Sequence, residues 1–144
     1  MCERVQALLE SAIVLAVGAH RGQKDRAGAP YILHSLRVGL SFRDPLEVMA
    51  GVLHDVVEDG GATLEQLRRA GFPADVVEAL DALTRRAGET YDDYLVRVKA
   101  NRLALRVKLA DLRDNLDESR IPEPSEDDRQ LWEKYRSALQ QLEC

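Results

Sequence analysis

The chain has 144 residues, a formal net charge of −5 and interspersed acidic and basic residues, so it is long enough to bury one core. This balance argues against a general nucleic-acid-binding protein, although a local basic pocket for a phosphate remains compatible with it. No apolar run reaches the length of a membrane span and no signal-peptide pattern opens the chain, so we expect a cytoplasmic protein without membrane association. Cys2 and Cys144 stand at the two ends, where no disulfide framework is expected.

Apolar residues recur at helical spacing through most of the chain, and no window alternates as a strand would. We also find no internal repeat. The sequence therefore predicts an all-α architecture, a helical bundle of about eight helices, in one domain over residues 1–144. Outside the central stretch, helices are predicted at 3–20, from Tyr31 to about Phe42, and at 63–70, 74–83, 91–99, 101–119 and about 128–141.

The central stretch of the chain begins with a strong helix-start signal. Asp44 is a favourable N-cap residue, Pro45 suits the first helical position, and Glu47 is the reciprocal residue of a capping box. The Gly60-Gly61 pair is the next evident stop. We therefore expect one helix from about residue 44 to residue 60, apolar on more than one side and central in the fold.

This central helix would carry an unusual density of ionisable groups. At 100° per residue, His54, Asp55, Glu58 and Gly51 fall on an arc of about 100°. Unpaired charge on a buried helix is costly, and a metal ion would compensate it. On this hypothesis Gly51 leaves room beside the ion.

A mixed imidazole and carboxylate site suits Mn²⁺, Zn²⁺ or Fe²⁺. The candidate ligands are His34, His54, Asp55 and one remote carboxylate, for which Asp111 is the obvious choice because it interrupts an apolar helical run. Glu58 would then act as a general base or position water. Taken singly, each residue also has an ordinary explanation: a lone His-Asp pair is common, and an acid such as Asp111 is more often solvated or salt-bridged.

Taken together, these residues resemble the HD-domain phosphohydrolases, specifically the hydrolase domain of the RelA/SpoT family and the standalone small alarmone hydrolases. The resemblance spans roughly residues 1–119. It rests on an ordered set of segments: Ala19-His20-Arg21-Gly22-Gln23, Gly28 to His34, Leu53 to Asp59, Ala82-Leu83-Thr84, and Val107 to Asp111 with Asn115.

The resemblance implies an all-α HD fold with one Mn²⁺-like ion and a small-molecule nucleotide substrate. It implies the metal ligands His34, His54, Asp55 and Asp111, and the catalytic carboxylates Glu58 and Asp59. Asn115 matches a residue near the bound nucleotide. The implied reaction is hydrolysis of the 3′-pyrophosphate of (p)ppGpp, the alarmone of the stringent response, to GDP or GTP and pyrophosphate.

Candidates for substrate contact are Lys24, Arg26, Tyr31, Lys108 and Asn115, with Arg113 as a further cation. His20 is expected to end the first helix and not to bind metal.

Two rival functions remain open: another nucleotide phosphatase, such as an NADPH 2′-phosphatase, and a non-catalytic nucleotide-binding HD module. Trp132 and Tyr135 on the last helix serve either the core, which we favour, or a homodimer interface.

The chain departs from the family pattern around the nucleotide. Asp25 stands where the alarmone hydrolases carry a basic residue, and an acid there cannot make a cation–π contact with guanine. Leu112 replaces the family's Arg, Asp114 replaces a His, and Ser35 replaces a Pro. The metal and catalytic residues are retained, so we expect hydrolysis with an altered nucleotide-binding surface.

Overall fold

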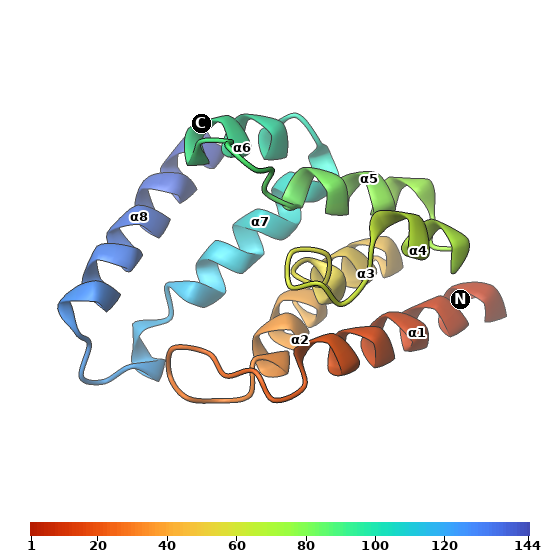
Figure 1. Ribbon diagram of the computed structural model, residues 1–144, viewed down its shortest axis with the longest axis horizontal. Coiled ribbons are helices and arrows are strands. Elements are labelled where there is room, and N and C mark those ends of the chain that lie inside the picture. The colour runs from red at the N-terminus through yellow and green to blue at the C-terminus, as the bar shows by residue number, and fades with distance from the viewer.

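The computed structural model describes residues 1–144 as eight α-helices and one 3-10 turn, with no strand (Figure 1). This confirms the all-α prediction and the number of helices. The helices are α1 (Glu3–His20), α2 (Ile32–Leu40), α3 (Pro45–Leu53), α4 (Leu64–Arg69), α5 (Ala74–Leu83), α6 (Tyr91–Lys99), α7 (Arg102–Asn115) and α8 (Glu126–Glu143), with the turn η1 (Glu118–Arg120) before α8. None of them combines the length and apolar character that a membrane span requires.

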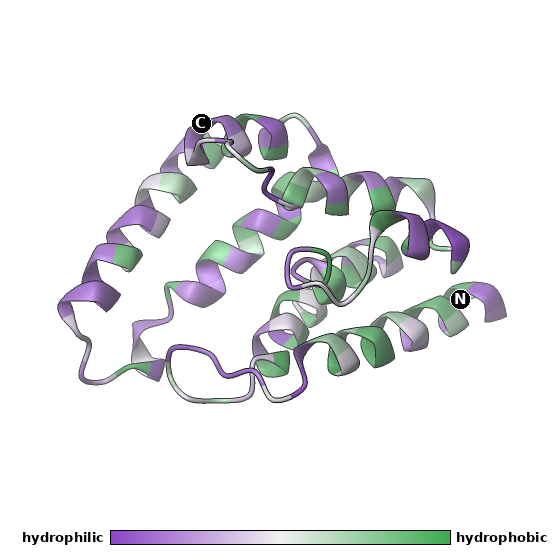
Figure 2. Cartoon of the chain, viewed as in Figure 1, coloured by the Kyte–Doolittle hydropathy of each residue, from purple (hydrophilic) through white to green (hydrophobic).

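Helix α3 is the centre of the bundle and packs against α1, α2, α5 and α7. Figure 2 shows α3 as largely hydrophobic, whereas α8 is largely hydrophilic. Met49, Val52 and Leu53 of α3 are fully buried, as are Leu80 of α5 and Leu112 of α7. The prediction that the central helix is apolar on more than one side is therefore confirmed.

Local capping explains where several helices begin. The Asp44 side chain accepts a hydrogen bond from the Leu46 N–H at 2.8 Å, with Pro45 at the first helical position. Thr63 and Gln66 form the predicted capping box at the start of α4. Thr90 caps α6 by a single hydrogen bond, which its side chain accepts from the Asp93 N–H.

The predicted end of the central helix is wrong, because α3 stops at Leu53 instead of Gly60. His54 is its C-cap residue, and residues 54–60 form tight turns. The cause is local: Nδ1 of His54 lies 2.6 Å from the Gly51 carbonyl, which in a continuing helix would accept from the Asp55 N–H. Helix α7 likewise ends at Asn115 and not near residue 119.

Gly51 has a packing role that differs from the predicted one. A Cβ at this position would lie 2.8 Å from Cα of Gly39, so the two glycines let the backbones of α2 and α3 touch. The hypothesis that Gly51 leaves room beside an ion is therefore wrong. This close crossing holds together the two helices that carry the candidate histidines.

Two helical glycines give opposite predictions for substitution by alanine. We expect Gly51→Ala to lower the free energy of unfolding by about 1–3 kcal/mol, because the new methyl group overlaps a backbone that must move. A Cβ added at Gly18 of α1 would meet nothing within 4 Å, so Gly18→Ala should stabilise by about 0.5–1 kcal/mol through helix propensity. Urea unfolding of both variants measures the difference, and equal effects would contradict the proposed contact between α2 and α3.

Candidate metal centre and active site

Three buried side chains from separate parts of the chain meet beside α3. His34 comes from α2, His54 from the end of α3 and Asp111 from α7, and one ligand atom from each lies within 4.8 Å of the others. Nε2 of His34 is 2.9 Å from Oδ1 of Asp111, and Nε2 of His54 is 3.4 Å from the same oxygen. These are three of the four predicted ligands.

Both histidine rings are oriented by hydrogen bonds on their far side. Nδ1 of His54 lies 2.6 Å from the Gly51 carbonyl oxygen, which can only accept, so Nδ1 carries the proton. Nδ1 of His34 lies 2.6 Å from Oδ2 of Asp114, a carboxylate oxygen to which a protonated Nδ1 donates. A neutral ring with its proton on Nδ1 presents the lone pair of Nε2 to the cluster. Nε2 of His54 is buried and has no hydrogen-bond partner.

The cluster favours a positive charge at its centre. Burial alone would lower the pKa of His54, but the negative charges of Asp55 and Asp111 raise this pKa well above its ordinary value. Burial would raise the pKa of Asp111, whereas Lys108 and the histidines hold it well below the ordinary range. A proton or a divalent cation could supply the positive charge, and the two compete for the same nitrogen atoms.

The donor set fits a divalent ion. Ligand atoms bound at ~2.1 Å lie roughly 3 Å apart where their bonds meet at right angles, which matches the spacings of 2.9 and 3.4 Å around Asp111. Two imidazoles and a carboxylate suit a transition metal. The unpartnered Nε2 of His54 is the atom that such an ion would satisfy.

Asp55 lies next to this cluster on the turn after α3. Its Oδ2 is 3.0 Å from Nε2 of His54 and accepts a hydrogen bond from the Tyr31 hydroxyl. Burial would raise the pKa of Asp55, but His54 lowers it to about 2. The carboxylate is therefore ionised at neutral pH and close to a candidate ligand, while its role as the fourth ligand stays a prediction.

The two predicted catalytic carboxylates lie on the same turn, nearer the surface. Oε1 of the exposed Glu58 accepts from the Arg85 backbone N–H at 2.8 Å. Oδ2 of Asp59 lies 3.3 Å from Nδ1 of His20, whose ring is buried. Partial burial and the nearby charge of Asp55 raise the pKa of Asp59. Because α3 ends at Leu53, turn geometry and not a helical arc sets the directions of both carboxylates.

Several predicted substrate contacts line one cavity of about 200 Å³ beside the cluster. Its walls include Lys24, Arg26, Tyr31 and Asn115, together with Trp132 from α8. Trp132 is buried and Tyr135 packs against the core, which agrees with the favoured prediction, and both side chains also line this cavity. Tyr31 connects the cavity to the cluster through Asp55.

Two residues that were predicted to contact substrate, Lys108 and Asn115, form hydrogen bonds with Asp111. Nζ of Lys108 lies 2.9 Å from Oδ2 of Asp111, and Nδ2 of Asn115 donates to its Oδ1 at 3.1 Å. Nearby on α7, the exposed Arg113 pairs instead with Glu143. Lys108 and Asn115 thus hold the candidate metal ligand in the structure as it stands, and their contacts with substrate stay a prediction.

Sequence reasoning missed the partners of these residues. The prediction that His20 ends α1 is confirmed, but neither that prediction nor the family resemblance indicates its contact with Asp59. Sequence reasoning treated Asp114 only as a departure from the family, although its carboxylate holds His34. Arg85 directly follows the Ala82-Leu83-Thr84 segment, and that position was the only signal of its contact with Glu58.

The fold is that of a known hydrolase structure. The solved structure of a metazoan orthologue of SpoT that hydrolyses ppGpp superimposes with a TM-score of 0.76 and 24% sequence identity, over 94% of this chain and 85% of that chain. No protein-family model matches the chain. The all-α HD-type bundle predicted from the sequence is therefore confirmed.

Curated proteins share sequence with this chain at higher identity. A GTP pyrophosphokinase of Streptomyces coelicolor is 36% identical over 121 residues, covering 75% of this chain and 14% of that protein. A guanosine-3′,5′-bis(diphosphate) 3′-pyrophosphohydrolase of Vibrio cholerae is 38% identical over 86 residues, 57% of this chain and 12% of that protein. The chain thus spans about one seventh of the length of these relatives. The resemblance to a RelA/SpoT-type HD hydrolase domain is confirmed.

Metal binding at the cluster predicts a measurable stabilisation. With free Mn²⁺ at 100 times its dissociation constant, binding to the native state alone adds ~2.7 kcal/mol, which raises Tm by roughly 5–10 °C at this size. We expect this rise relative to EDTA in the wild type and in the surface variant Glu65→Gln, but not in Asp111→Asn. Differential scanning fluorimetry measures it, and an equal rise in Asp111→Asn would place the ion elsewhere.

Proposed function

We propose that this chain is a metal-dependent phosphohydrolase that removes pyrophosphate from the 3′ position of (p)ppGpp. The observation that carries the proposal is the convergence of the Nε2 atoms of two histidines on the buried carboxylate of Asp111, with two more carboxylates on the adjoining turn. The names of the Vibrio cholerae relative and of the metazoan structure support the choice of substrate.

The proposed ligands are His34, His54, Asp55 and Asp111, and the proposed ion is Mn²⁺. Imidazole and carboxylate donors together suit this ion. When bound, such an ion polarises the phosphoryl group and makes water more acidic. Tyr31 and Asn115 hold the Asp55 and Asp111 carboxylates by hydrogen bonds, so the ligands are in place before any ion arrives.

Hydrolysis transfers the pyrophosphoryl group from the ribose O3′ to water. The O3′–P bond breaks, a new O–P bond forms, and a proton from water ends on the ribose oxygen. Glu58 is the proposed acceptor of the water proton, because one of its oxygens is fixed by the Arg85 N–H and its side chain is open to solvent. Asp59, fixed by His20, is the proposed second carboxylate that orients the water.

The cavity of about 200 Å³ is the proposed place of the nucleoside. Lys24 and Arg26 provide positive charge at its wall, and Tyr31, Asn115 and Trp132 provide hydrogen-bonding and stacking surfaces. Arg26 is held by Asp128 of α8 at 2.7 Å, so its guanidinium is already oriented. Lys108, beside Asp111, is the proposed contact for a phosphate next to the ion.

A second candidate is hydrolysis of another ribose phosphate, such as the 2′-phosphate of NADPH. The observation that favours it is Asp25, which brings a negative charge to the cavity wall where the alarmone hydrolases carry a basic residue. Parallel assays of ppGpp and NADPH with Mn²⁺ separate the two substrates. Metal binding without turnover of either, or of other nucleotides, would favour a non-catalytic binding module.

Substitution of the proposed base gives the sharpest test of the reaction. We expect Glu58→Gln to lower kcat for pyrophosphate release by about 10²- to 10⁴-fold, because an amide cannot accept the proton. Mn²⁺ affinity should stay unchanged, since Glu58 lies outside the ligand cluster. A coupled pyrophosphate assay and isothermal titration with Mn²⁺ measure the two quantities.

The matched control is Glu65→Gln, which makes the same chemical change on the exposed helix α4. It should retain wild-type kcat and wild-type Mn²⁺ affinity. Retained activity in Glu58→Gln would move the base to Asp59. Loss of activity in both variants would show that the assay responds to surface charge instead of the proposed base.

A further inference from the structure

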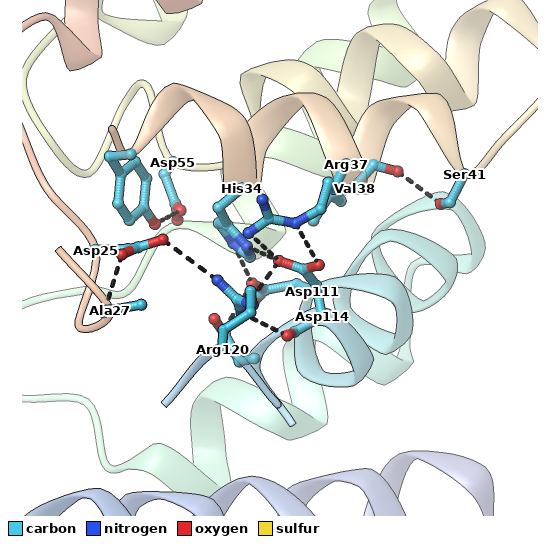
Figure 3. A network of polar contacts seen from close by, with 12 residues as sticks. Asp25, Ala27, His34, Arg37, Val38, Ser41, Asp55, Asp111, Asp114 and Arg120 are labelled. Carbon is cyan, nitrogen blue, oxygen red and sulfur yellow. Dashed lines mark hydrogen bonds and ion pairs between the residues drawn. The ribbon is translucent and has the colours of Figure 1, made fainter. Parts of the chain in front are cut away.

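Asp114 lies directly behind the candidate ligand His34, on the side away from the metal cluster. Figure 3 shows His34 of α2 pointing between Asp111 and Asp114 of α7. Nδ1 of His34 is 2.6 Å from Oδ2 of Asp114, and Nε2 is 2.9 Å from Oδ1 of Asp111. The ring therefore bridges two carboxylates, of which only Asp111 belongs to the donor cluster.

Two arginines hold the Asp114 carboxylate in place. Arg37 donates from Nε to Oδ1 at 2.8 Å and from Nη2 to Oδ2 at 3.1 Å, a two-pronged contact (Figure 3). Arg120 donates to the backbone carbonyl of Asp114 at 2.6 Å and lies 3.6 Å from its Oδ2. A carboxylate paired with two guanidinium groups is ionised and can only accept hydrogen bonds.

We propose that Asp114 is a positioning residue of the metal centre, which fixes the Nδ1–H tautomer of His34 and turns its Nε2 lone pair toward the ion site between His34, His54 and Asp111. The inference rests on the proposed metal-binding function. A histidine ligand is more basic and better oriented when its second nitrogen donates to a carboxylate. The position distinguishes this chain, because Asp114 replaces the histidine of the family pattern.

The contacts around Asp114 extend to the wall of the cavity proposed for the nucleoside. Nη1 of Arg120 lies 3.3 Å from Oδ2 of Asp25, so one arginine contacts both acids that depart from the family pattern (Figure 3). Asp25 in turn accepts from the backbone N–H groups of Ala27 and Ala29, both at 2.9 Å. The two substitutions therefore form one connected network that runs from the cavity wall to the back of His34.

Asn at position 114 provides a nearly isosteric test. The carboxylate receives three donors over its two oxygens: one N–H of His34 and two of Arg37. An amide has one accepting oxygen, so its NH₂ group faces Nε of Arg37 in one orientation and both His34 and Nη2 of Arg37 in the other. Facing His34, it would favour the other tautomer and place a proton on Nε2, where the ion should bind.

We expect Asp114→Asn to weaken Mn²⁺ binding by about 10- to 100-fold, the usual effect of losing such a support. Isothermal titration of the purified protein with Mn²⁺ measures this. ¹⁵N NMR of the metal-free wild type, at a pH where His34 is neutral, should show the proton on Nδ1. In Asp114→Asn the proton should shift toward Nε2, a change that a purely structural role would not produce.

The control is Asp117→Asn, which removes the same charge nearby without touching His34. Asp117 is exposed, and its carboxylate accepts only from the backbone N–H and the hydroxyl of Ser119, at the start of η1. This variant should keep wild-type Mn²⁺ affinity. Equal affinity losses in both variants would reduce the effect to net charge and overturn the proposal.

The proposal also fails if folded Asp114→Asn binds Mn²⁺ as the wild type does. If that variant does not fold, the wild-type NMR measurement still decides, because a proton on Nε2 of neutral His34 overturns the proposal. Neither measurement involves a nucleotide. A wild type that binds Mn²⁺ in an Asp114-dependent manner but does not release pyrophosphate from ppGpp would refute the proposed function while supporting this inference.

Discussion

The structure depends on one buried set of charges, His34, His54 and Asp111, that must be held together at the centre of a helical bundle. Burying an ionised group without compensation costs several kcal/mol, so every member needs a fixed partner. Lys108 neutralises one oxygen of Asp111, and the outer nitrogen of each histidine has its own acceptor. The touching backbones of α2 and α3 then bring the two rings within one cluster.

Helix α7 serves the core and the site at the same time. Ala104, Val107 and Leu112 are fully buried and pack into the hydrophobic core. Asp111 on the same helix reaches the candidate ion site, where Asn115 one turn later donates to it. Because the core residues fix the rotation of α7, the direction of Asp111 is set by apolar packing. Any change that rotates this helix would disturb the core and the site together.

Much of the fold could be predicted from the sequence because its signals are local. The caps at Asp44, Thr63 and Thr90 and the apolar periodicity set most helix boundaries. The early end of α3 could not be predicted, since it depends on the His54 ring taking the Gly51 carbonyl. Contacts between residues that are far apart in the sequence could not be predicted either. The contact between Asp114 and His34 joins residues 80 positions apart, and no local sequence pattern predicts it.

The loop before α2 shows what this chain has in place of a basic residue at position 25. The Asp25 side chain accepts from two backbone N–H groups of its own loop, and Gly28 supplies the left-handed conformation (φ 85°) that the turn needs. The two sides of the loop pair through backbone hydrogen bonds from Asp25 N–H to the Ala29 carbonyl and from Tyr31 N–H to the Gln23 carbonyl. A loop closed on itself in this way has little conformational freedom left to lose when a ligand arrives. On the proposed function, this loop would select ligands by rejecting molecules that do not fit a preformed rim, and not by folding around whatever enters.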